Sequence, residues 1–409
     1  MDQLSTFLSS IKPRHDDDAV DRLNYYYTVL LILAFSITLS AKQYVGKPVQ
    51  CWVPAQFKGA WEQYTEDYCF VENTYWVPMH ENIPDDHDER EDRQISYYQW
   101  VPFVLALQAL MFHIPHIIWK LLNWQSGLHV SGIVGMACDS KNIDCAEREG
   151  AVKSVAGHIE AALNIQRYRK EVNPVMVFFG FFKPKGAYVT ILYLVIKLLF
   201  LGNLIGQFFL LNAFIGSDYT FWGAEIIKDI QAGQEWEYSG HFPRVTMCDF
   251  QVRELGNLHR WSVQCVIMIN MFNEKIYLFI WWWLVLVTIV TALNFIWWIF
   301  VTISSQPRVN FIRKYIEAGR STELGKKRLT RGEMDQVVEF TKNRLRLDGV
   351  FVLRLISGNA GDVISTEIIY QMWKQFVGPS AVPDRKPSAP NSAAEAKERE
   401  AMGAAAAVN

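Results

Sequence analysis

Long apolar runs alternate along the chain with charged connecting stretches. Four of the runs are long enough to cross a bilayer as helices, which takes ~20 residues each. They predict spanning helices at residues 25–41, 101–122, 188–215 and 276–304. The chain is therefore expected to be an all-α membrane protein built on a bundle of four transmembrane helices.

The second apolar run, residues 101–122, has aromatic and basic residues at both ends. Tyr98 and Trp100 precede it, while Trp119 and Lys120 lie near its other end. Amphipathic rings and a lysine that reaches toward the headgroups are typical of the two interfaces of a spanning helix. Pro115 lies inside the run and removes one backbone hydrogen bond, so we expect a kink there.

An even number of spans leaves both termini on the same side of the membrane. Lys and Arg number 28 in residues 1–24, 123–187 and 305–409, against 9 in residues 43–100 and 216–275. The positive-inside rule places the richer set in the cytoplasm. We therefore expect a plasma-membrane protein that crosses the membrane several times and has both termini in the cytoplasm.

The segments outside the bundle divide accordingly into cytoplasmic and extracellular parts. We expect extracellular loops at residues 42–100 and 216–275. We expect the cytoplasmic parts to be an N-terminal segment at residues 1–24, a loop at 123–187, a helical domain at 305–378 and a disordered tail at 379–409. The tail is rich in Pro, Ser and Ala and has no apolar periodicity, which is the basis for expecting disorder.

Composition excludes several functional classes. The 409-residue chain is 50% hydrophobic and has a formal net charge of only −2, so its charge gives no support for a nucleic-acid partner. The sequence has no phosphate-binding glycine loop, nucleophile motif or set of metal ligands at a characteristic spacing. We therefore expect neither an enzyme nor a bound metal or cofactor.

The six cysteines divide with the predicted topology. Cys138 and Cys145 fall in the cytoplasmic loop, where thiols stay reduced. Two cysteines fall in each extracellular loop, where disulfides form, and these are Cys51, Cys69, Cys248 and Cys265. Four cysteines allow three pairings, and their spacing does not choose among them.

The first extracellular loop is acidic, with 11 Asp and Glu against 4 Lys and Arg in residues 43–100. Such a charge would concentrate cations at a pore entrance if it faced one, and it is equally consistent with a solvated surface. The charged run Asp85–Arg93 is expected to be a solvated rim.

Charged residues near the spans indicate where protein or lipid partners are needed. Lys197 lies deep in the third span, so it should face protein or water and pair with a carboxylate, a carbonyl or a lipid phosphate. Arg308, Arg313 and Lys314 follow the fourth span and suit anionic headgroups. The acidic run that begins at Asp16 precedes the first span, where carboxylates cap a helix.

Two histidines of the second span lie on one helix face with Gln108 and Lys120. His113 and His116 have neither a cysteine nor a carboxylate at ligand spacing, so a metal site is not expected. Interhelical hydrogen bonds or a face beside a lumen explain them better.

Several motifs resemble innexins, the gap-junction proteins of invertebrates. YYQWVPF, followed by Pro115 and Trp119, is similar to the second innexin span. VGKPVQCWVPAQF and YCFVENTYWVP resemble the first innexin loop, and FPRVTMCDF and QCVIMINMFNEKIY resemble the second. The resemblance covers residues 16–310 and lies in the loops and spans that match.

The resemblance implies a large-pore channel whose subunits surround a central axis. Eight identical or related innexin subunits would form a hemichannel, with a helical cytoplasmic dome and with disulfide-stapled extracellular loops that carry minor β structure. Two hemichannels would dock between adjacent cells and pass ions and small metabolites. The implied disulfides are Cys51–Cys265 and Cys69–Cys248.

The resemblance also suggests which residues line the pore. Leu4, Phe7, Leu8 and Ile11 form one apolar face of a short N-terminal helix, which either lies on the membrane or folds into the pore mouth. For the second arrangement, the expected pore-lining residues are Asp2, Gln3 and Leu4 in the funnel and Lys42, Gln43 and Lys47 at the outer end.

Two alternatives to a gap-junction subunit remain open from the sequence. One is a hemichannel that releases small molecules without docking, and the other is a tetraspan adhesion protein without a pore of its own. Recordings from paired and single cells separate the three functions.

Overall fold

The computed structural model describes residues 16–78, 80–123, 127–172, 186–215, 242–324 and 329–378. The predicted funnel residues Asp2, Gln3 and Leu4 and the predicted disordered tail lie outside this part of the chain.

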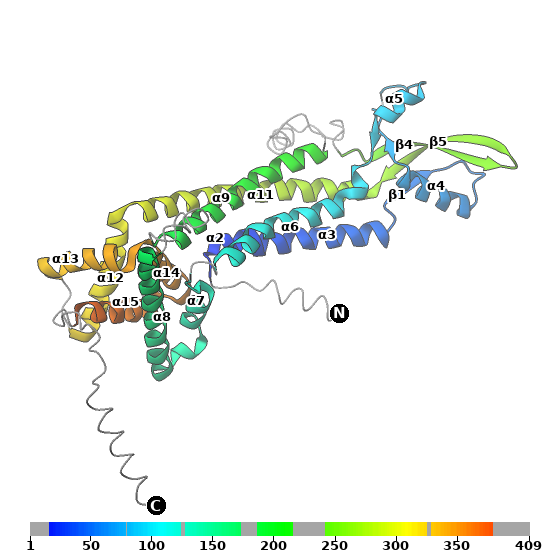
Figure 1. The fold of residues 1–409 in the computed structure, drawn as a ribbon. Helices are drawn as coiled ribbons and strands as arrows, with labels where there is room; N and C mark the ends of the chain where they lie inside the picture. The colour runs from blue at the N-terminus through cyan, green and yellow to red at the C-terminus, as the bar shows by residue number, and fades with distance from the viewer. Residues whose placement is uncertain are drawn as a thin grey trace, which may run out of the picture.

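Four long helices form the centre of the molecule (Figure 1). The first comprises α2 (Ala19–Arg22), a π-helical turn (Leu23–Thr28) and α3 (Val29–Tyr44). The other three are α6 (Tyr97–Asn123), α9 (Tyr188–Ile215) and α11 (Met268–Ile303). All four are long and apolar enough to cross a membrane, and only 28–44% of each one's most apolar window is buried within the protomer. Their remaining apolar surface is available to lipid or to neighbouring subunits.

Three of these helices begin earlier than the apolar runs do, and α6 is one of them, because it begins at Tyr97 rather than at residue 101. The first begins at Ala19 rather than at residue 25, because the Asp18 side chain accepts hydrogen bonds from the Val20 and Asp21 backbone and caps it. The fourth begins at Met268 rather than at residue 276, directly after a strand. Its first turns contain Asn270 and Glu274, which are buried in protein. Hydropathy alone excludes such residues from a span.

An antiparallel sheet lies at one end of the bundle (Figure 1). Its strand order is β1-β5-β4-β2-β3, with bounds Val49–Trp52, Asn257–Ile267, Val245–Glu254, Thr74–Tyr75 and Gln94–Ile95. Strands β4 and β5 form a long hairpin closed by Leu255 and Gly256, whose φ values are 48° and 88°. Positive φ at both central residues is the geometry of a type I′ turn, which matches strand twist.

Helix α4 (Gly59–Val71) packs beside the sheet, and α5 (His87–Asp92) precedes β3. We call the sheet, α4, α5 and the two disulfides described below the collar. The β structure expected in the extracellular loops is this five-stranded sheet.

A second group of helices lies at the other end of the bundle (Figure 1). It contains α7, α8, α12, α13, a π-helical turn, α14 and α15, with bounds Val130–Ala137, Cys145–Val172, Ser305–Leu324, Arg331–Glu339, Phe340–Leu345, Arg346–Ala360 and Asp362–Val377. A short 3-10 turn, Ser140–Ile143, joins α7 to α8. We call this group the helical domain.

The helical domain is attached to the bundle by polar and apolar contacts. The Asp348 carboxylate on α14 accepts hydrogen bonds from the Thr190 backbone and hydroxyl, at 3.1 and 2.8 Å, near the start of α9. One core cluster continues from the domain into the adjacent part of the bundle, through Tyr193 and Trp298. A second cluster joins the rest of the bundle to the collar. Each end of the bundle therefore shares a core with the structure it carries.

Candidate functional site

Two disulfides join segments of the two predicted extracellular loops. Cys51 and Cys265 lie opposite each other on β1 and β5 and are bonded, with an S–S distance of 2.03 Å. Cys69 on α4 is bonded to Cys248 on β4, with an S–S distance of 1.98 Å. All four cysteines are buried. This pairing is the one that the family resemblance implies.

The sulfur atoms of Cys51, Cys69 and Cys265 lie within 4.8 Å of one another. Because all three are in disulfides, they offer no thiolate to a metal ion. Cys138, which directly follows α7, and Cys145, which begins α8, are free thiols. Burial raises the pKa of Cys138, which makes its thiol less reactive.

The start of α6 holds the end of α4. The Gln99 side chain donates hydrogen bonds to the carbonyls of Phe70 and Val71, at 2.6 and 3.1 Å. Tyr98 donates to the carbonyls of Cys69 and Phe70. The last carbonyls of a helix have no partner within it, so these side chains cap α4. The sequence identified Tyr98 only as an interface residue and gave no signal for its capping role.

A partly buried polar contact holds the later part of the first loop to the hairpin. Asp249 on β4 accepts a hydrogen bond from the Tyr75 hydroxyl at 3.1 Å, and it lies 2.6 Å from the Arg90 guanidinium. Burial and the Asp249 charge raise the pKa of Tyr75 to about 12. The run Asp85–Arg93 was expected to be a solvated rim, and most of its residues are exposed. Arg90 is an exception, because its partner lies on β4.

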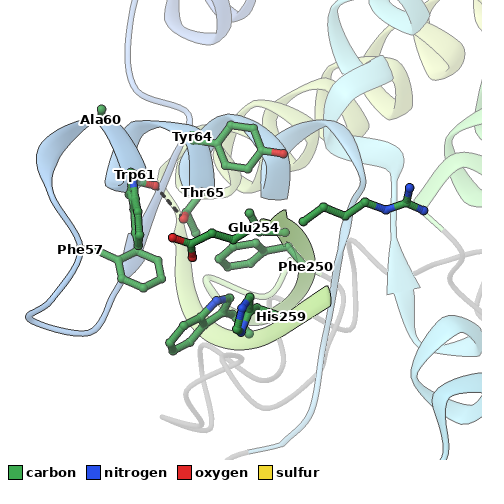
Figure 2. A pocket seen from close by; sticks show the side chains of 11 residues that line it. Phe57, Ala60, Trp61, Tyr64, Thr65, Phe250, Glu254 and His259 are labelled. Atoms are coloured by element: carbon green, nitrogen blue, oxygen red, sulfur yellow. Dashed lines mark hydrogen bonds between the residues drawn. The ribbon is translucent and has the colours of Figure 1, made fainter. Parts of the chain in front are cut away.

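An aromatic cavity lies between α4 and the hairpin (Figure 2). Its volume is about 530 Å³, and we call it the aromatic cup. The lining residues are Phe57, Ala60, Trp61, Tyr64, Thr65, Phe250, Val252, Arg253, Glu254, His259 and Trp261. The Phe57 ring lies edge-on to Trp61 and Trp261, at centroid distances of 5.5 and 5.1 Å. No sequence pattern predicted this cavity.

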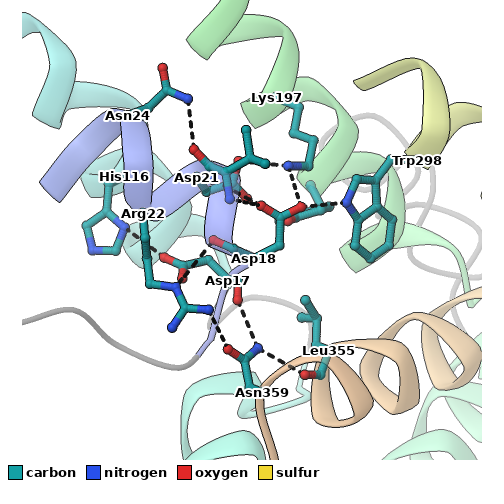
Figure 3. A network of polar contacts seen from close by, with 12 residues as sticks. Asp17, Asp18, Asp21, Arg22, Asn24, His116, Lys197, Trp298, Leu355 and Asn359 are labelled. Atoms are coloured by element: carbon teal, nitrogen blue, oxygen red, sulfur yellow. Dashed lines mark hydrogen bonds and ion pairs between the residues drawn. The ribbon is translucent and has the colours of Figure 1, made fainter. Parts of the chain in front are cut away.

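A buried charge cluster lies where the bundle meets the helical domain (Figure 3). Lys197 on α9 lies 3.0 Å from Asp18 and 2.8 Å from Asp21, and its side chain is 1% exposed. Asp21 also accepts a hydrogen bond from Tyr193 at 2.5 Å, and Asp18 accepts one from Trp298 at 2.7 Å. We call these five residues the junction cluster, and we include in it Asp17 and its partners Arg22, His116 and Asn359. It joins the start of α2 to α9 and α11.

Asp17 extends the junction cluster to the helical domain. Its carboxylate lies 3.5 Å from Arg22 and 3.9 Å from His116 on α6, and its backbone carbonyl accepts a hydrogen bond from Asn359 on α14 at 2.9 Å. Arg22 donates to the Asn359 side-chain oxygen at 2.8 Å (Figure 3). The cluster thus connects three spanning helices and the helical domain to the residues that precede α2.

Asp17 and Asp18 have opposite electrostatic environments. Burial, and then the charges of Asp21 and Asp16, raise the pKa of Asp17 well above its ordinary value. Burial alone would also raise the pKa of Asp18, but the Lys197 charge and the Trp298 hydrogen bond lower it below its ordinary value. Asp18 is therefore stabilised as a carboxylate, whereas Asp17 favours the protonated form.

Of the three partners expected for Lys197, the structure shows the carboxylate. Its ammonium group is paired with two carboxylates inside the protomer, so it does not reach a lipid phosphate. The acidic run was expected to cap the first helix, and Asp18 does cap α2. The sequence did not indicate that Asp18 and Asp21 are also the partners of Lys197.

The structure contradicts the prediction that Gln43 lines the outer end of the pore. Its side chain is 5% exposed and donates to the Gln99 carbonyl on α6, so it cannot face a lumen. Lys47 is exposed and lies 3.2 Å from Glu66. The Lys42 ammonium lies 5.8 Å from the centre of the Phe272 ring. A pore-lining position for Lys42 and Lys47 stays a prediction.

The remaining predicted positions lie near the bundle. Pro115 is buried within α6, and a kink at this residue stays a prediction. Arg308, Arg313 and Lys314 lie on α12, shortly after α11 ends. Arg313 lies 3.9 Å from Glu317, and Lys314 lies 3.8 Å from Asp362. Their contact with lipid headgroups also stays a prediction.

Comparison with known proteins gives one consistent result. A profile described as Innexin matches residues 17–376. The chain is 46% identical to "Innexin unc-9" of Caenorhabditis elegans over 371 residues, which cover 90% of this chain and 94% of that protein. It is 41% identical to "Innexin-19" of Caenorhabditis briggsae, covering 91% and 89% of the two chains. It is also 41% identical to "Innexin eat-5" of C. elegans, covering 92% and 91%.

Proposed function

Because the chain belongs to the innexin family of gap-junction channel subunits, we propose that eight copies surround an axial pore and that two such rings dock between adjacent cells. The family is a channel family, and the chain is a multi-pass membrane protein of the gap junction. The joined pore passes ions and small metabolites, and the ring also accepts related innexin subunits.

The proposed orientation places the collar outside the cell and the helical domain and both termini in the cytoplasm. The distribution of Lys and Arg supports this orientation. The oxidation states also support it, because the disulfides lie in the collar and the free thiols Cys138 and Cys145 lie at the opposite end.

The observation that carries the docking proposal is the construction of the collar. Two disulfides and one sheet join both loops into a single unit at the end of the bundle. The β4–β5 hairpin extends beyond the bundle (Figure 1), and Leu255 at its turn is 99% exposed. A fixed, protruding surface suits contact with a second ring, because little conformational entropy is lost on binding.

The proposed pore runs along the ring axis from the collar to the helical domains. Asp2, Gln3 and Leu4 form its funnel, and Lys42 and Lys47 lie at its outer end. The junction cluster supports this arrangement, because it holds Asp17 and Asp18, the residues that follow the N-terminal segment, against the bundle. A wide pore of this kind selects by ring charge and diameter.

Recordings from paired cells that express this chain alone test the proposal. We expect a junctional current between two expressing cells and none when only one cell expresses the chain. Current confined to single cells would identify a hemichannel that does not dock, and neither current would identify an adhesion protein. Either result would overturn the docking proposal. Counting subunits in images of the purified ring tests the number eight.

A further inference from the structure

The aromatic cup has the composition of a cation-binding site, and we propose that it binds a small organic cation of the alkylammonium class. Five of its lining residues are aromatic, and they come from the approach to α4, α4 itself and both hairpin strands: Phe57, Trp61, Tyr64, Phe250 and Trp261. The faces of aromatic rings carry partial negative charge and attract quaternary ammonium groups. This assignment goes beyond the channel function.

The size of the cup suits a small ligand. Its volume of about 530 Å³ lies within the usual range for ligand pockets, ~300–1,000 Å³. Contacts between Phe57 and both Trp61 and Trp261 hold these rings in position. Trp61 and Tyr64 remain 47% and 51% exposed, so a ligand could bury aromatic surface that the protomer leaves open.

One carboxylate in the cup faces the space that a ligand would occupy. In Figure 2, Glu254 points toward Thr65 and Trp61 on α4, into the space between the aromatic side chains. The Glu254 side chain is exposed to solvent and makes no hydrogen bond or ion pair within the described part of the chain. An unpaired carboxylate among aromatic rings favours a cation over a neutral molecule of the same shape.

The strand geometry separates Glu254 from the neighbouring basic residue. Successive side chains of a strand point to opposite faces, so Phe250, Val252 and Glu254 share one face of β4. Arg253 belongs to the other face of the strand, although it is also among the lining residues. In the register of the hairpin, Trp261 lies opposite Phe250 and His259 lies opposite Val252. The cup therefore combines one face of the hairpin with α4.

Calorimetry with choline tests the proposal on the purified full-length protein. The protein is placed in phosphatidylglycerol nanodiscs, because choline lipids would compete for the cup. The neutral control ligand is 3,3-dimethylbutan-1-ol, which has the shape of choline without its charge. We expect choline to bind and the neutral alcohol to bind at least about tenfold more weakly.

Matched variants locate the binding site. We expect Trp61→Ala to weaken choline binding about tenfold and Glu254→Gln to weaken it severalfold. The controls Trp52→Ala and Glu62→Gln change exposed residues outside the cup and should leave binding unchanged. Thermal unfolding of each variant verifies that it is folded.

Three results would overturn the proposal: no choline binding to the wild-type protein, equal binding of choline and the alcohol, or unchanged binding in both cup variants. None of them depends on docking, because the assay uses isolated protein. A protein that binds choline and fails to couple cells would contradict the channel proposal alone.

Discussion

The collar and the junction cluster both connect distant parts of the chain to the same four helices, but they do so by different interactions. In the collar, disulfides join residues 214 and 179 positions apart. In the junction cluster, buried ion pairs and hydrogen bonds join Asp18 and Asp21 to Lys197 and Asp17 to Asn359. Covalent bonds respond to reductant, whereas ion pairs respond to pH and to the loss of one charge.

The difference teaches which end of the subunit can change conformation. The collar is covalently fixed, which suits the proposed docking against another ring. The junction cluster has no covalent cross-link within the described residues, and it is centred on one lysine between two carboxylates. Its connections can therefore be altered by protonation, and they bear directly on the segment that precedes α2.

The largest effect is expected from the double substitution Cys51→Ser and Cys69→Ser. It removes both disulfides, each of which contributes ~2–4 kcal/mol to the free energy of unfolding. We expect coupling between paired cells to be abolished and the thermal midpoint of the purified protein to fall. Cys138→Ser is the matched control, because Cys138 is a free thiol far from the collar, and it should couple normally.

Coupling retained by the double mutant would show that the collar does not depend on its covalent links. A reductant gives a second measurement of the same contrast. It should lower the stability of the wild-type protein and leave that of the double mutant unchanged.

The next largest effect is expected from Lys197→Met at the junction cluster. The change leaves Asp18 and Asp21 buried without their cation, which costs ~3–5 kcal/mol. We expect a lower unfolding midpoint, followed by tryptophan fluorescence, and less protein at the cell surface. Lys120→Met is the control, because Lys120 lies on the exposed face of α6.

A double-mutant cycle identifies the cause of that loss. Adding Asp21→Asn to Lys197→Met should restore part of the stability, because one uncompensated carboxylate is removed. If Lys197→Met proved as stable as Lys120→Met, the cluster would not hold the bundle and the domain together.

The sequence predicted the bundle well because each span is a long apolar run, which leaves little choice of structure. It located the collar cysteines, but their pairing came from family resemblance. The sequence also showed that Lys197 needs a polar partner. It could not identify Asp18 and Asp21, because their position before a helix is fully explained by capping.

Two failures share a physical reason. The assignment of Gln43 to the pore came from the family resemblance, but the exposure of this residue depends on where α6 packs. The aromatic cup likewise depends on the packing of α4 against the hairpin. Side-chain periodicity describes one element at a time, so it does not reveal which faces of two elements meet.

A smaller effect is expected from Gln99→Leu in the collar. The substitution removes the hydrogen bonds to the Phe70 and Val71 carbonyls, at a cost of ~1–2 kcal/mol. We expect a modest fall in the unfolding midpoint under oxidising conditions, and a larger fall after reduction, when α4 has lost its disulfide as well. Gln63→Leu on the exposed part of α4 is the control. Equal stability of the two variants would show that the α4 end needs no cap from α6.

The smallest expected effect on stability distinguishes Asp17 from its neighbour Asp18 in the junction cluster. Asp17 has a raised pKa, so its contribution to stability is complete below 3.8 and is lost as pH rises through the raised value. Asp17→Asn mimics the protonated form, so it should raise the free energy of unfolding at neutral pH, by about 1 kcal/mol, and flatten its dependence on pH.

Asp18 should behave in the opposite way. Its pKa is lowered, so its contribution is present above 3.8 and is lost as pH falls toward the lowered value. Asp18→Asn should therefore destabilise the protein at neutral pH, where it removes a charge partner of Lys197 and weakens the cap of α2. Unfolding midpoints of both variants, measured between acidic and neutral pH, test whether Asp17 and Asp18 affect stability in opposite ways. If Asp17→Asn were the less stable variant at neutral pH, the ionised form of Asp17 would be the one that the cluster stabilises, and protonation there would loosen the junction instead of tightening it.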